Sequence, residues 1–429
     1  MTIDKSMNVI LIGIDTLRYD HLGFAGYHRN TSPYIDALTK ESLVFHNCFS
    51  QAPSTGPSFA SIFTSRYPTF HGVINVWTRN RGWSLAENVP TLQEILKSNG
   101  YATAAFTEGG TLMPHIGLAK GFDVYETTAS SLTDARKHPA VQWMKEKKER
   151  PFFLFFQTFA THAPYITPTT SKDMDDPNYN GRFPANIAEV LKSGAVDKTF
   201  RKIMEEVKHI PKEIERLKKM YDACITYMDH FIGQLLEEMR TFGLEQNTII
   251  VLTSDHGEEF MEHGNIYHQN IYDEILHVPL VIKVPLARTQ KNINQIVRSI
   301  DITPTVLDLL NIQTEETLQG TSLLPTTEGI DLNLVSLAEH GYKYFSLRSK
   351  YYKYIYRKKT EQEVYSVVSD PAEKDDVSTY SPALVEKLHN EFQTELTHKK
   401  LIRPPHKMFI LKNGQTIGKI KSTSHVDTP

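Results

Sequence analysis

Short hydrophobic runs recur along most of the chain, and they are continuous rather than alternating. They span residues 9–14, 102–106, 151–156, 248–252 and 278–284. A continuous apolar run of this length is typical of a strand buried on both faces, as in a parallel sheet. We therefore predict that these runs form the inner strands of one large sheet.

Amphipathic helical patterns separate several of these runs. Residues 91–98 form one such pattern, and residues 213–240 form a longer one that ends at Phe242-Gly243. An alternation of buried strands with helices favours an α/β fold in which helices sandwich a mostly parallel sheet. We predict that one large domain of this kind spans residues 1–330.

The pattern changes after residue 330. Alternating aromatic and basic residues over 344–359 favour antiparallel strands with one solvated face, and residues 382–399 have a helical pattern. We predict a small C-terminal antiparallel sheet plus a helix, which together form an α+β subdomain over residues 331–400. Residues 401–429 lack clear periodicity and are expected to be a loose tail.

A long polar stretch interrupts the large domain at residues 166–212. Proline, asparagine, aspartate and lysine are scattered through it, and it lies between a predicted strand and a predicted helix. Two interpretations stay open: a lid or substrate loop, or a surface excursion without a fixed structure.

Composition narrows the classes of partner and compartment. The 429 residues carry a net charge of -3, which gives no electrostatic case for nucleic acid. No stretch reaches the ~18 apolar residues that a membrane span needs, and residues 9–14 are too few for a signal segment, so we expect a soluble protein. Cys48 and Cys224 are best interpreted as two free thiols, which favours a cytoplasmic location. The oligomeric state stays open.

Candidate chemistry gathers at the predicted strand ends, because ligands of such sheets bind outside the carboxyl ends of the strands. Asp15 follows the first run, and Asp255 and His256 follow a later one. Two carboxylates and an imidazole suit one divalent metal ion, with Mn²⁺ or Zn²⁺ favoured and Ca²⁺ possible. The alternative for Asp15 taken alone is a helix cap.

A second candidate is Thr55, which opens a stretch of small residues that has the pattern of a helix start. Pro57 fits the first turn of that helix. A hydroxyl at the cap position lies where backbone N–H groups favour an oxyanion, and a metal ion would make it a better nucleophile. The alternative is that Thr55 only caps the helix.

Several segments form an ordered series of motifs along the chain. They are Thr55-Gly56-Pro57-Ser58-Phe59, Thr64-Ser65-Arg66, His71-Gly72-Val73, SDHGEEFMEHG at 254–264, YDEILHVPLVI at 272–282, SIDITPTVLDLL at 299–310, LQGTSLLP at 318–325 and EVYSVVSDPAEKDDV at 363–377. In this order they resemble the motifs of the sulfatases of the alkaline-phosphatase superfamily, whose signature is Cys/Ser-x-Pro-Ser-Arg, followed by Thr-Gly-Arg and His-Gly. The resemblance covers residues 8–400.

The resemblance implies an alkaline-phosphatase-like fold and a set of functional residues. Asp15, Asp255 and His256 would be metal ligands, and Thr55 would be both the nucleophile and a further ligand. His162, in Thr-His-Ala-Pro-Tyr, matches the family's Pro-His-x-Pro-Tyr element and would touch the ester and protonate the leaving group. The resemblance implies further roles for the residues His268, as a second acid or an anion contact, and Asn75 and Thr107, as substrate contacts.

The chain also departs from the sulfatase pattern. Thr55 stands where sulfatases have the Cys or Ser that is converted to formylglycine, and Phe59 stands where they have the Arg that orients the aldehyde hydrate. Thr16 stands where a second acidic ligand is expected. A lysine and a histidine expected near residues 105–110 are replaced by Thr107-Glu108-Gly109-Gly110. These changes disfavour formylglycine chemistry.

We therefore predict a metal-dependent hydrolase of small-molecule phosphate esters, monoesters or diesters, that acts through a phosphothreonine at Thr55. Two alternatives from the same superfamily are a sulfuric ester hydrolase that works without formylglycine and a soluble phosphoryl-group transferase. A two-metal phosphodiesterase would need further ligands, for which His162, His263 and His268 are the candidates. A degenerate binding scaffold is the non-enzyme alternative. His340 is a further candidate for the site.

Overall fold

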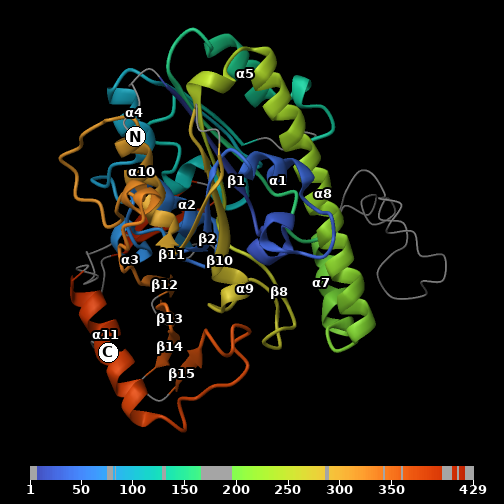
Figure 1. Cartoon of the computed structure of the whole chain (residues 1–429), viewed down its shortest axis with the longest axis vertical. Coiled ribbons are helices and arrows are strands. Elements are labelled where there is room, and N and C mark those ends of the chain that lie inside the picture. The colour runs from blue at the N-terminus through green and yellow to red at the C-terminus, as the bar shows by residue number, and fades with distance from the viewer. Residues whose placement is uncertain are drawn as a thin grey trace.

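The structure is a computed structural model in which the N-terminal domain and the smaller C-terminal sheet lie next to each other (Figure 1). It describes residues 7–74, 81–82, 84–127, 132–165, 196–285, 289–341, 344–358, 361–398, 408–412 and 415–420. Asn75 and the first part of the predicted insertion, residues 166–195, lie outside the described residues.

A mostly parallel eight-stranded sheet forms the centre of the larger domain, as predicted. Its order is β11-β2-β10-β7-β1-β6-β4-β5, and β10 is the one strand that runs antiparallel to both of its neighbours. The strands are β1 (Asn8–Ile14), β2 (Leu43–Phe49), β4 (Ala102–Phe106), β5 (Val124–Glu126), β6 (Phe152–Thr158), β7 (Thr248–Ser254), β10 (His277–Lys283) and β11 (Lys291–Arg298).

Three of these strands were not predicted from the sequence, and there is a physical reason in each case. β2 contains the polar pair His46-Asn47, β11 mixes polar and apolar residues, and β5 has only three residues. Both β2 and β11 lie toward one edge of the sheet, where fewer side chains are covered on both faces. Their hydrophobic pattern is therefore weaker than that of the inner strands.

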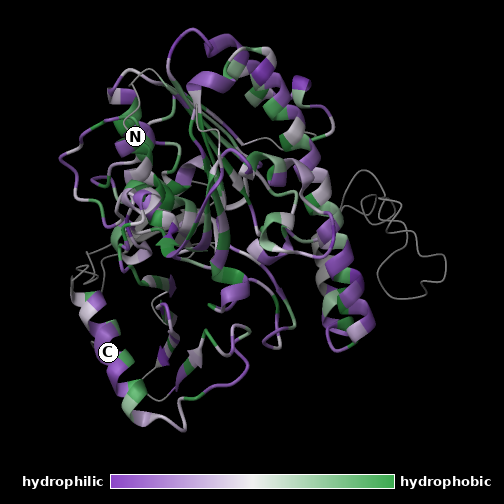
Figure 2. Ribbon diagram, viewed as in Figure 1, coloured by the Kyte–Doolittle hydropathy of each residue, from purple (hydrophilic) through white to green (hydrophobic). Residues whose placement is uncertain are grey.

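Helices cover both faces of the central sheet (Figure 1). The inner strands are the most hydrophobic part of this sheet (Figure 2). Ile10 and Ile12 of β1 pack with one group of helices, and Val9 and Leu11 pack with the other. This alternation is what a strand buried on both faces requires. The first group is α1 (Pro33–Thr39), α5 (Pro139–Lys147) and α8 (Pro211–Thr241), and the second is α2 (Thr55–Thr64), α4 (Leu92–Ser98) and α10 (Ile302–Leu309).

Local capping explains where some of these helices begin. Thr91 and Glu94 form a reciprocal capping box at the start of α4. Asp229 of α8 accepts hydrogen bonds from the backbone N–H groups of Tyr34 (3.0 Å) and Ile35 (2.8 Å), which are the second and third residues of α1. The long helix α8 therefore caps its neighbour as well as packing against the sheet.

Short elements complete the larger domain. Within the predicted insertion, α7 occupies residues Val196–Val207. The other short helices and strands are α3 (Pro68–His71), α9 (Asp273–Leu276), β3 (Arg81–Gly82), β8 (Glu259–Phe260) and β9 (Ile266–Tyr267). The 3-10 turns are η1 (Tyr19–His21), η2 (Gly23–Ala25), η3 (Gly110–Leu112), η4 (Pro114–Ile116), η5 (Ala135–Lys137), η7 (Glu245–Asn247), η8 (Ser299–Asp301) and η9 (Leu324–Glu328).

The predicted C-terminal sheet and helix are confirmed. The sheet is antiparallel, and α11 packs on it through Leu388 and Phe392, which contact the same apolar cluster as Tyr354. The elements are β12 (Ser336–His340), β13 (Tyr344–Arg348), β14 (Tyr352–Lys358), β15 (Glu361–Ser366) and α11 (Pro382–His398).

The basic face of these C-terminal strands is not wholly solvated, and the sequence interpretation is wrong at Lys353. Lys353 is fully buried and pairs with Asp273 (2.7 Å) and Glu373 (2.9 Å). Asp273 also pairs with Arg348 at 3.0 Å. Because Asp273 begins α9 of the larger domain, this network ties the two parts together.

The predicted tail also contains regular structure. β16 (Met408–Lys412) and β17 (Gln415–Ile420) are antiparallel to each other, and β16 pairs with β3. The expectation of a tail without structure is therefore wrong for these residues. The local sequence does not reveal the pairing of β16, because β3 lies far away in the chain.

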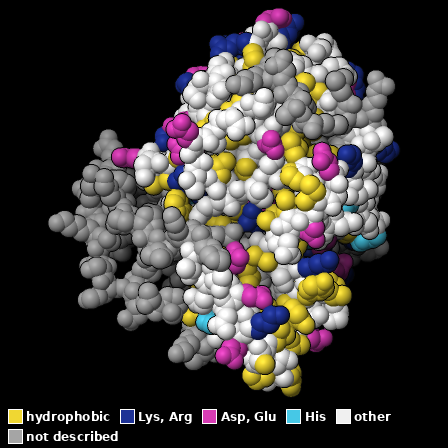
Figure 3. All heavy atoms as spheres, turned by 60° about the vertical axis from the view of Figure 1, so that its left-hand side comes forward, with side chains coloured by type: hydrophobic (Ala, Val, Ile, Leu, Met, Phe, Trp, Pro, Cys, Tyr) yellow, Lys and Arg dark blue, Asp and Glu magenta, His cyan; other side chains and the backbone are white. Residues whose placement is uncertain are grey.

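The described residues also show the state of the cysteines and the distribution of charge over one face. In the described part of the chain, no helix is both long enough and apolar enough to cross a membrane. Cys48 and Cys224 are buried and free, as expected. On the face shown in Figure 3, basic and acidic side chains are interspersed rather than gathered by sign, so that face carries no field of a single sign.

Glu339 of β12 joins the C-terminal sheet to α3. Its carboxylate accepts hydrogen bonds from the backbone N–H and from the hydroxyl of Thr69, both at 3.0 Å. Only 1% of Glu339 is exposed, and this burial raises its pKa to about 8.

We predict that Glu339 makes stability depend on pH. Because its folded pKa lies above the unfolded value of about 4.3, its contribution is fully present below about pH 4 and is lost as the pH rises through about 8. In Glu339→Gln, the free energy of unfolding relative to wild type should rise across this window by up to about 1.4 kcal/mol per pH unit. Urea denaturation of both proteins at several pH values between about 4 and 8 measures this difference in unfolding free energy.

The matched control is Glu361→Gln, which changes an exposed residue of the same sheet. Its unfolding free energy should follow the wild-type pH curve. A Glu339→Gln curve parallel to that of wild type would contradict the prediction.

Candidate active site

Two neighbouring parallel strands bring the predicted ligand residues together. In the register of β1 and β7, Ile14 lies opposite Ser254, so the next residues, Asp15 and Asp255, leave the sheet side by side. His256 follows directly. All three side chains are completely buried, and their ligand atoms lie within 4.8 Å of one another.

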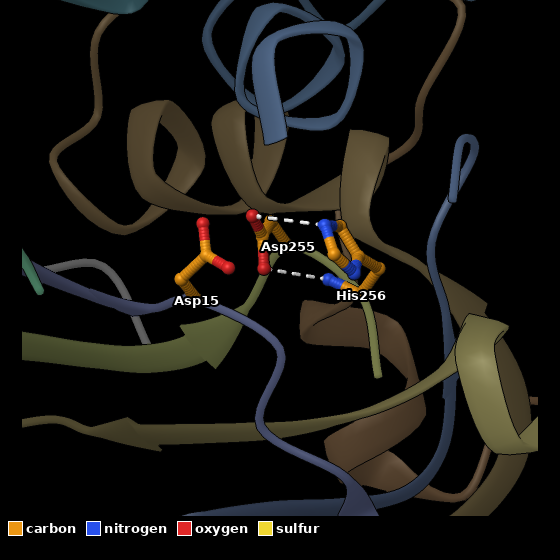
Figure 4. A group of neighbouring side chains, drawn as sticks. All are labelled: Asp15, Asp255 and His256. Atoms are coloured by element: carbon orange, nitrogen blue, oxygen red, sulfur yellow. Dashed lines mark hydrogen bonds and ion pairs between the residues drawn. The ribbon is translucent and has the colours of Figure 1, made fainter. Parts of the chain in front are cut away.

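Three atoms of this cluster have no hydrogen-bond partner: Asp15 Oδ1, Asp255 Oδ2 and His256 Nε2. His256 Nδ1 donates to the carbonyl oxygen of Gly257 (2.9 Å), which leaves a lone pair on Nε2 in the neutral ring. Nε2 lies 3.5 Å from Asp255 Oδ2, and Asp15 lies beside this pair (Figure 4). Buried polar atoms without partners are costly, so facing acceptors of this kind fit a bound cation.

The electrostatics of the cluster support the same interpretation. Burial raises the pKa of Asp15 well above its usual value, and the charge of Asp255 raises it further. Burial lowers the pKa of His256, which favours the neutral ring that a metal ion requires. Two carboxylate oxygens and one imidazole nitrogen fit a divalent cation, whose charge would offset the repulsion between the carboxylates.

Thr55 lies beside this cluster. It is the first residue of α2, and Ser54 rather than Thr55 is the N-cap. The hydroxyl of Thr55 donates to Asp15 Oδ2 at 2.9 Å, and 6% of the residue is exposed. The hydroxyl is therefore placed at a helix N-terminus, next to the candidate cation site, rather than used as a cap.

Thr16 takes a different role from the acidic residue expected at its position. Its hydroxyl donates to the carbonyl oxygen of Thr161 (2.7 Å), and its backbone N–H donates to Asp255 Oδ1 (3.0 Å). Its φ of 57° is a left-handed conformation that a β-branched residue rarely adopts. Thr16 thus orients Asp255 through the backbone at some cost in strain.

Two more histidines approach the cluster. His162 Nδ1 donates to the carbonyl oxygen of Ala163 (2.6 Å), which leaves Nε2 as the ring atom available to a ligand. The ring of His268 lies 4.4 Å from that of His256 and 5.4 Å from that of His162, measured between centroids. Either predicted acid therefore lies next to the buried cluster.

Glu258 is a further functional candidate. It lies within the segment SDHGEEFMEHG at 254–264, but it was not predicted as a site residue. It is completely buried, and its two oxygens bind Nδ1 of His268 (3.2 Å) and the hydroxyl of Tyr165 (2.9 Å). Burial raises the pKa of Glu258 to about 7. Its place two residues after His256 was the available signal, because the same turn that aims His256 also carries Glu258 inward.

A cavity of about 460 Å³ opens beside these residues. Ser54, His162 and His268 line it from the larger domain, and His340 and Arg357 line it from the C-terminal sheet. His340 therefore approaches the site, as the sequence suggested. Arg357 was not predicted as a site residue, because the alternating aromatic and basic residues around it are typical of a strand whose basic face is solvated.

The two predicted substrate contacts, Thr107 and Asn75, are not among the residues that line this cavity in the described part of the chain. Thr107 is buried, and its hydroxyl donates to the carbonyl oxygen of Glu126 (3.4 Å) and accepts from the N–H of Gly109 (3.3 Å). It is not among the described residues that line the cavity. Asn75 lies outside the described residues, so both assignments stay predictions.

Comparison with known families identifies the chain. The family model described as Sulfatase matches residues 7–312, which include the strand-end cluster and Thr55. The chain belongs to the sulfatase family. A second model, described as N-sulphoglucosamine sulphohydrolase, C-terminal, matches residues 261–401 of this sulfatase-family protein.

Individual relatives agree with this assignment. Arylsulfatase K of Canis lupus familiaris is 22% identical over 471 residues, covering 96% of this chain and 87% of the relative. An ulvan-active sulfatase of Formosa agariphila is 27% identical over 441 residues, covering 91% and 80%. The crystal structure of the phosphonate monoester hydrolase of Agrobacterium radiobacter shares the fold, with a TM-score of 0.73 and 17% identity over 92% of this chain and 96% of that one.

The sulfatase-family signature is altered here for a reason visible in the core. Phe59, at the position of the signature arginine, is completely buried, and its ring packs on Phe155 at 5.1 Å and Phe63 at 6.3 Å between centroids. A Cβ on Gly13 would approach the Phe59 ring to 2.6 Å, so the ring occupies the space beside that glycine. This position serves packing rather than the site.

We predict that Phe59→Arg, which restores the signature residue, destabilises the protein. An unpaired guanidinium in this apolar cluster should lower the free energy of unfolding by at least about 3 kcal/mol. Phe59→Leu is the matched control and should cost roughly half of that or less, because it only leaves a small void. Urea denaturation measures both, and a stable Phe59→Arg variant would show that the arginine finds a partner in the site.

Proposed function

We propose that this protein is a metal-dependent sulfuric ester hydrolase that uses the hydroxyl of Thr55 directly as its nucleophile. The observation that carries the proposal is the cluster of unpartnered ligand atoms of Asp15, Asp255 and His256 beside Thr55 Oγ1, within a domain of the sulfatase family. The phosphate-ester prediction from the sequence becomes the second candidate, because the relatives reported above support sulfate esters better.

Asp15, Asp255, His256 and Thr55 would hold the metal ion, and their mixed oxygen and nitrogen donors favour Mn²⁺ or Zn²⁺, with Ca²⁺ possible. A divalent cation at this place lowers the pKa of a neighbouring hydroxyl and offsets charge on the ester oxygens. The N-terminus of α2 adds backbone N–H groups that favour the same negative charge.

The residues allow a two-step displacement. Thr55 Oγ1 attacks the sulfur atom, the bond between sulfur and the ester oxygen breaks, and the hydroxyl proton passes to Asp15 Oδ2, which already accepts it. His162 or His268 gives a proton to the departing alcohol. Water then attacks the sulfur of the Thr55 sulfate ester, the histidine takes a proton from this water, and Thr55 regains its own from Asp15.

Phosphate-ester hydrolysis is the second candidate, and the identity of Thr55 favours it. Threonine has a single hydroxyl, so a sulfate or phosphate group bound to it must be released by attack of water. A phosphothreonine can be hydrolysed in the same way. A transferase would use an acceptor alcohol in place of water. The cavity of about 460 Å³ suits a small-molecule ester in each case.

We predict that the metal-loaded enzyme hydrolyses aryl sulfates faster than phosphate monoesters or diesters. The assay compares the three ester classes after chelation and reloading with Mn²⁺, Zn²⁺ or Ca²⁺. Activity should vanish with the chelator and return with at least one ion in wild type, but not in Asp255→Ala. Turnover of phosphate esters alone would replace the sulfatase proposal by the second candidate.

We predict that Thr55→Ala lowers kcat by at least about 10³-fold, as loss of a nucleophile does in other hydrolases. Folding and metal binding should stay largely intact, because the three buried ligands remain. Thr55→Ser restores the hydroxyl and is the control that should recover most of the activity. Stopped-turnover mass spectrometry should detect a covalent adduct on residue 55 in wild type and in Thr55→Ser, but not in Thr55→Ala. Near-full activity of Thr55→Ala would refute the assignment.

A further inference from the structure

The cavity beside the candidate active site is shared by two parts of the chain. The larger domain contributes the residues of the proposed reaction, including His162 and His268. The C-terminal sheet contributes a second wall, with His340 at the end of β12, Tyr344 at the start of β13 and Arg357 near the end of β14. A substrate that fills the cavity therefore contacts residues that take no part in the proposed reaction.

This second wall carries positive charge and no negative charge among the described lining residues. Of the described residues that line the cavity, Arg357 is the only lysine or arginine, and none is acidic. Burial lowers the pKa of His340, and the charge of Arg357 lowers it further, so His340 is neutral near pH 7. The guanidinium of Arg357 is thus the fixed positive charge that faces the cavity from the C-terminal sheet.

Arg357 is held in place without a ligand. Its Nε donates to Glu363 Oε1 (2.7 Å), and its Nη2 donates to the hydroxyl of Tyr272 (3.1 Å). The guanidinium carbon also lies over the rings of Tyr272 at 5.7 Å and Tyr344 at 5.4 Å from their centroids. A side chain ordered in this way loses little entropy when it binds an anion.

Glu363 does not cancel this charge toward the cavity. It accepts hydrogen bonds from the hydroxyls of Tyr272 (2.8 Å) and Tyr365 (3.0 Å) as well as from Arg357, and it is not among the described lining residues. The ion pair is therefore a dipole whose cationic end lies at the cavity.

We propose that Arg357 is a specificity-determining residue that binds a second anionic group, a carboxylate or a sulfate, on the alcohol part of the substrate. The inference rests on the proposed function, since it assumes that the ester itself reacts at Thr55. The side chains of Gln269 and Asn270 line the same cavity and suit a polar, hydroxylated alcohol. The substrate class is thus an ester of a polar alcohol that carries a further negative charge.

The test compares esters that differ in one group. The probes are para-nitrophenyl sulfate, the same ring with an added carboxylate, and the same ring with a second sulfate, used with the metal-loaded full chain. Phosphate analogues replace them if the wild type prefers phosphate. Wild type should show a higher kcat/KM for at least one anion-bearing ester than for the plain ester, and the two anionic probes distinguish a carboxylate site from a sulfate site.

Two substitutions should move this preference in opposite directions. Arg357→Gln should reduce the ratio of kcat/KM for the anion-bearing over the plain ester by about tenfold or more, the usual effect of losing a charge-assisted contact, and mainly through KM. Glu363→Gln keeps Arg357 and removes its counter-charge, so it should raise the ratio. Arg357→Lys keeps the charge without the planar fork and should fall between.

The matched control is Arg240→Gln, which removes an exposed arginine of α8 that pairs with Glu237 and Glu245. It should leave the preference unchanged, which separates a local effect from a general change of charge. Thermal unfolding of each variant confirms that it is folded. A ratio that does not change in Arg357→Gln and Glu363→Gln would overturn the inference while leaving the proposed function intact.

A binding measurement keeps the two proposals separate. Calorimetric titration with para-nitrophenol and its carboxylated or sulfonated derivatives, which carry no hydrolysable sulfate ester, does not depend on turnover. At least one anionic phenol should bind wild type about tenfold more tightly than para-nitrophenol, and Arg357→Gln should remove the difference. Equal binding refutes the inference about Arg357, whereas failure of wild type to hydrolyse any ester refutes the proposed function.

Discussion

The structure depends on one constraint, the meeting of two carboxylates and an imidazole in a completely buried place. The parallel register of β1 and β7 forces Asp15 and Asp255 together, and the turn after β7 adds His256. Their facing atoms have no protein partner, which is costly unless a cation or a proton is shared among them. The strained backbone of Thr16, which donates an N–H to Asp255, is one of the means that hold this arrangement.

The altered signature is a change of role rather than a loss of structure. Phe59 extends the apolar layer under α2, and Gly13 leaves the space that its ring needs. The arginine of the sulfatase pattern could not occupy this position without a buried, unpaired charge. The same helix still presents the hydroxyl of Thr55 to Asp15. The fold thus keeps the cluster of Asp15, Asp255 and His256 beside residue 55, and this is why we argue the proposed reaction from Thr55.

The C-terminal sheet belongs to the site as well as to the fold. Buried Lys353, paired with Asp273 and Glu373, fixes the sheet against a segment that follows the turn after β7, and Glu339 accepts a hydrogen bond from the backbone of α3. With the sheet held in this way, the second wall of the cavity, which includes Arg357, has a defined position relative to His162 and His268. Two parts of the chain with different hydrophobic patterns therefore form one cavity.

By itself, the sequence determined the inner strands, the long helices, the sulfatase-family resemblance and the cluster of Asp15, Asp255 and His256, because continuous apolar runs and residues at strand ends are local signals. It could not reveal β2 or β11, whose polar residues weaken the hydrophobic pattern, or the pairing of β16 with the distant β3. Only the tertiary structure decided that Phe59 is a core residue, that Glu258 binds His268, and that Arg357 faces the cavity. These roles depend on the distant side chains that surround each group and on its exposure to solvent. A local sequence pattern contains neither kind of information.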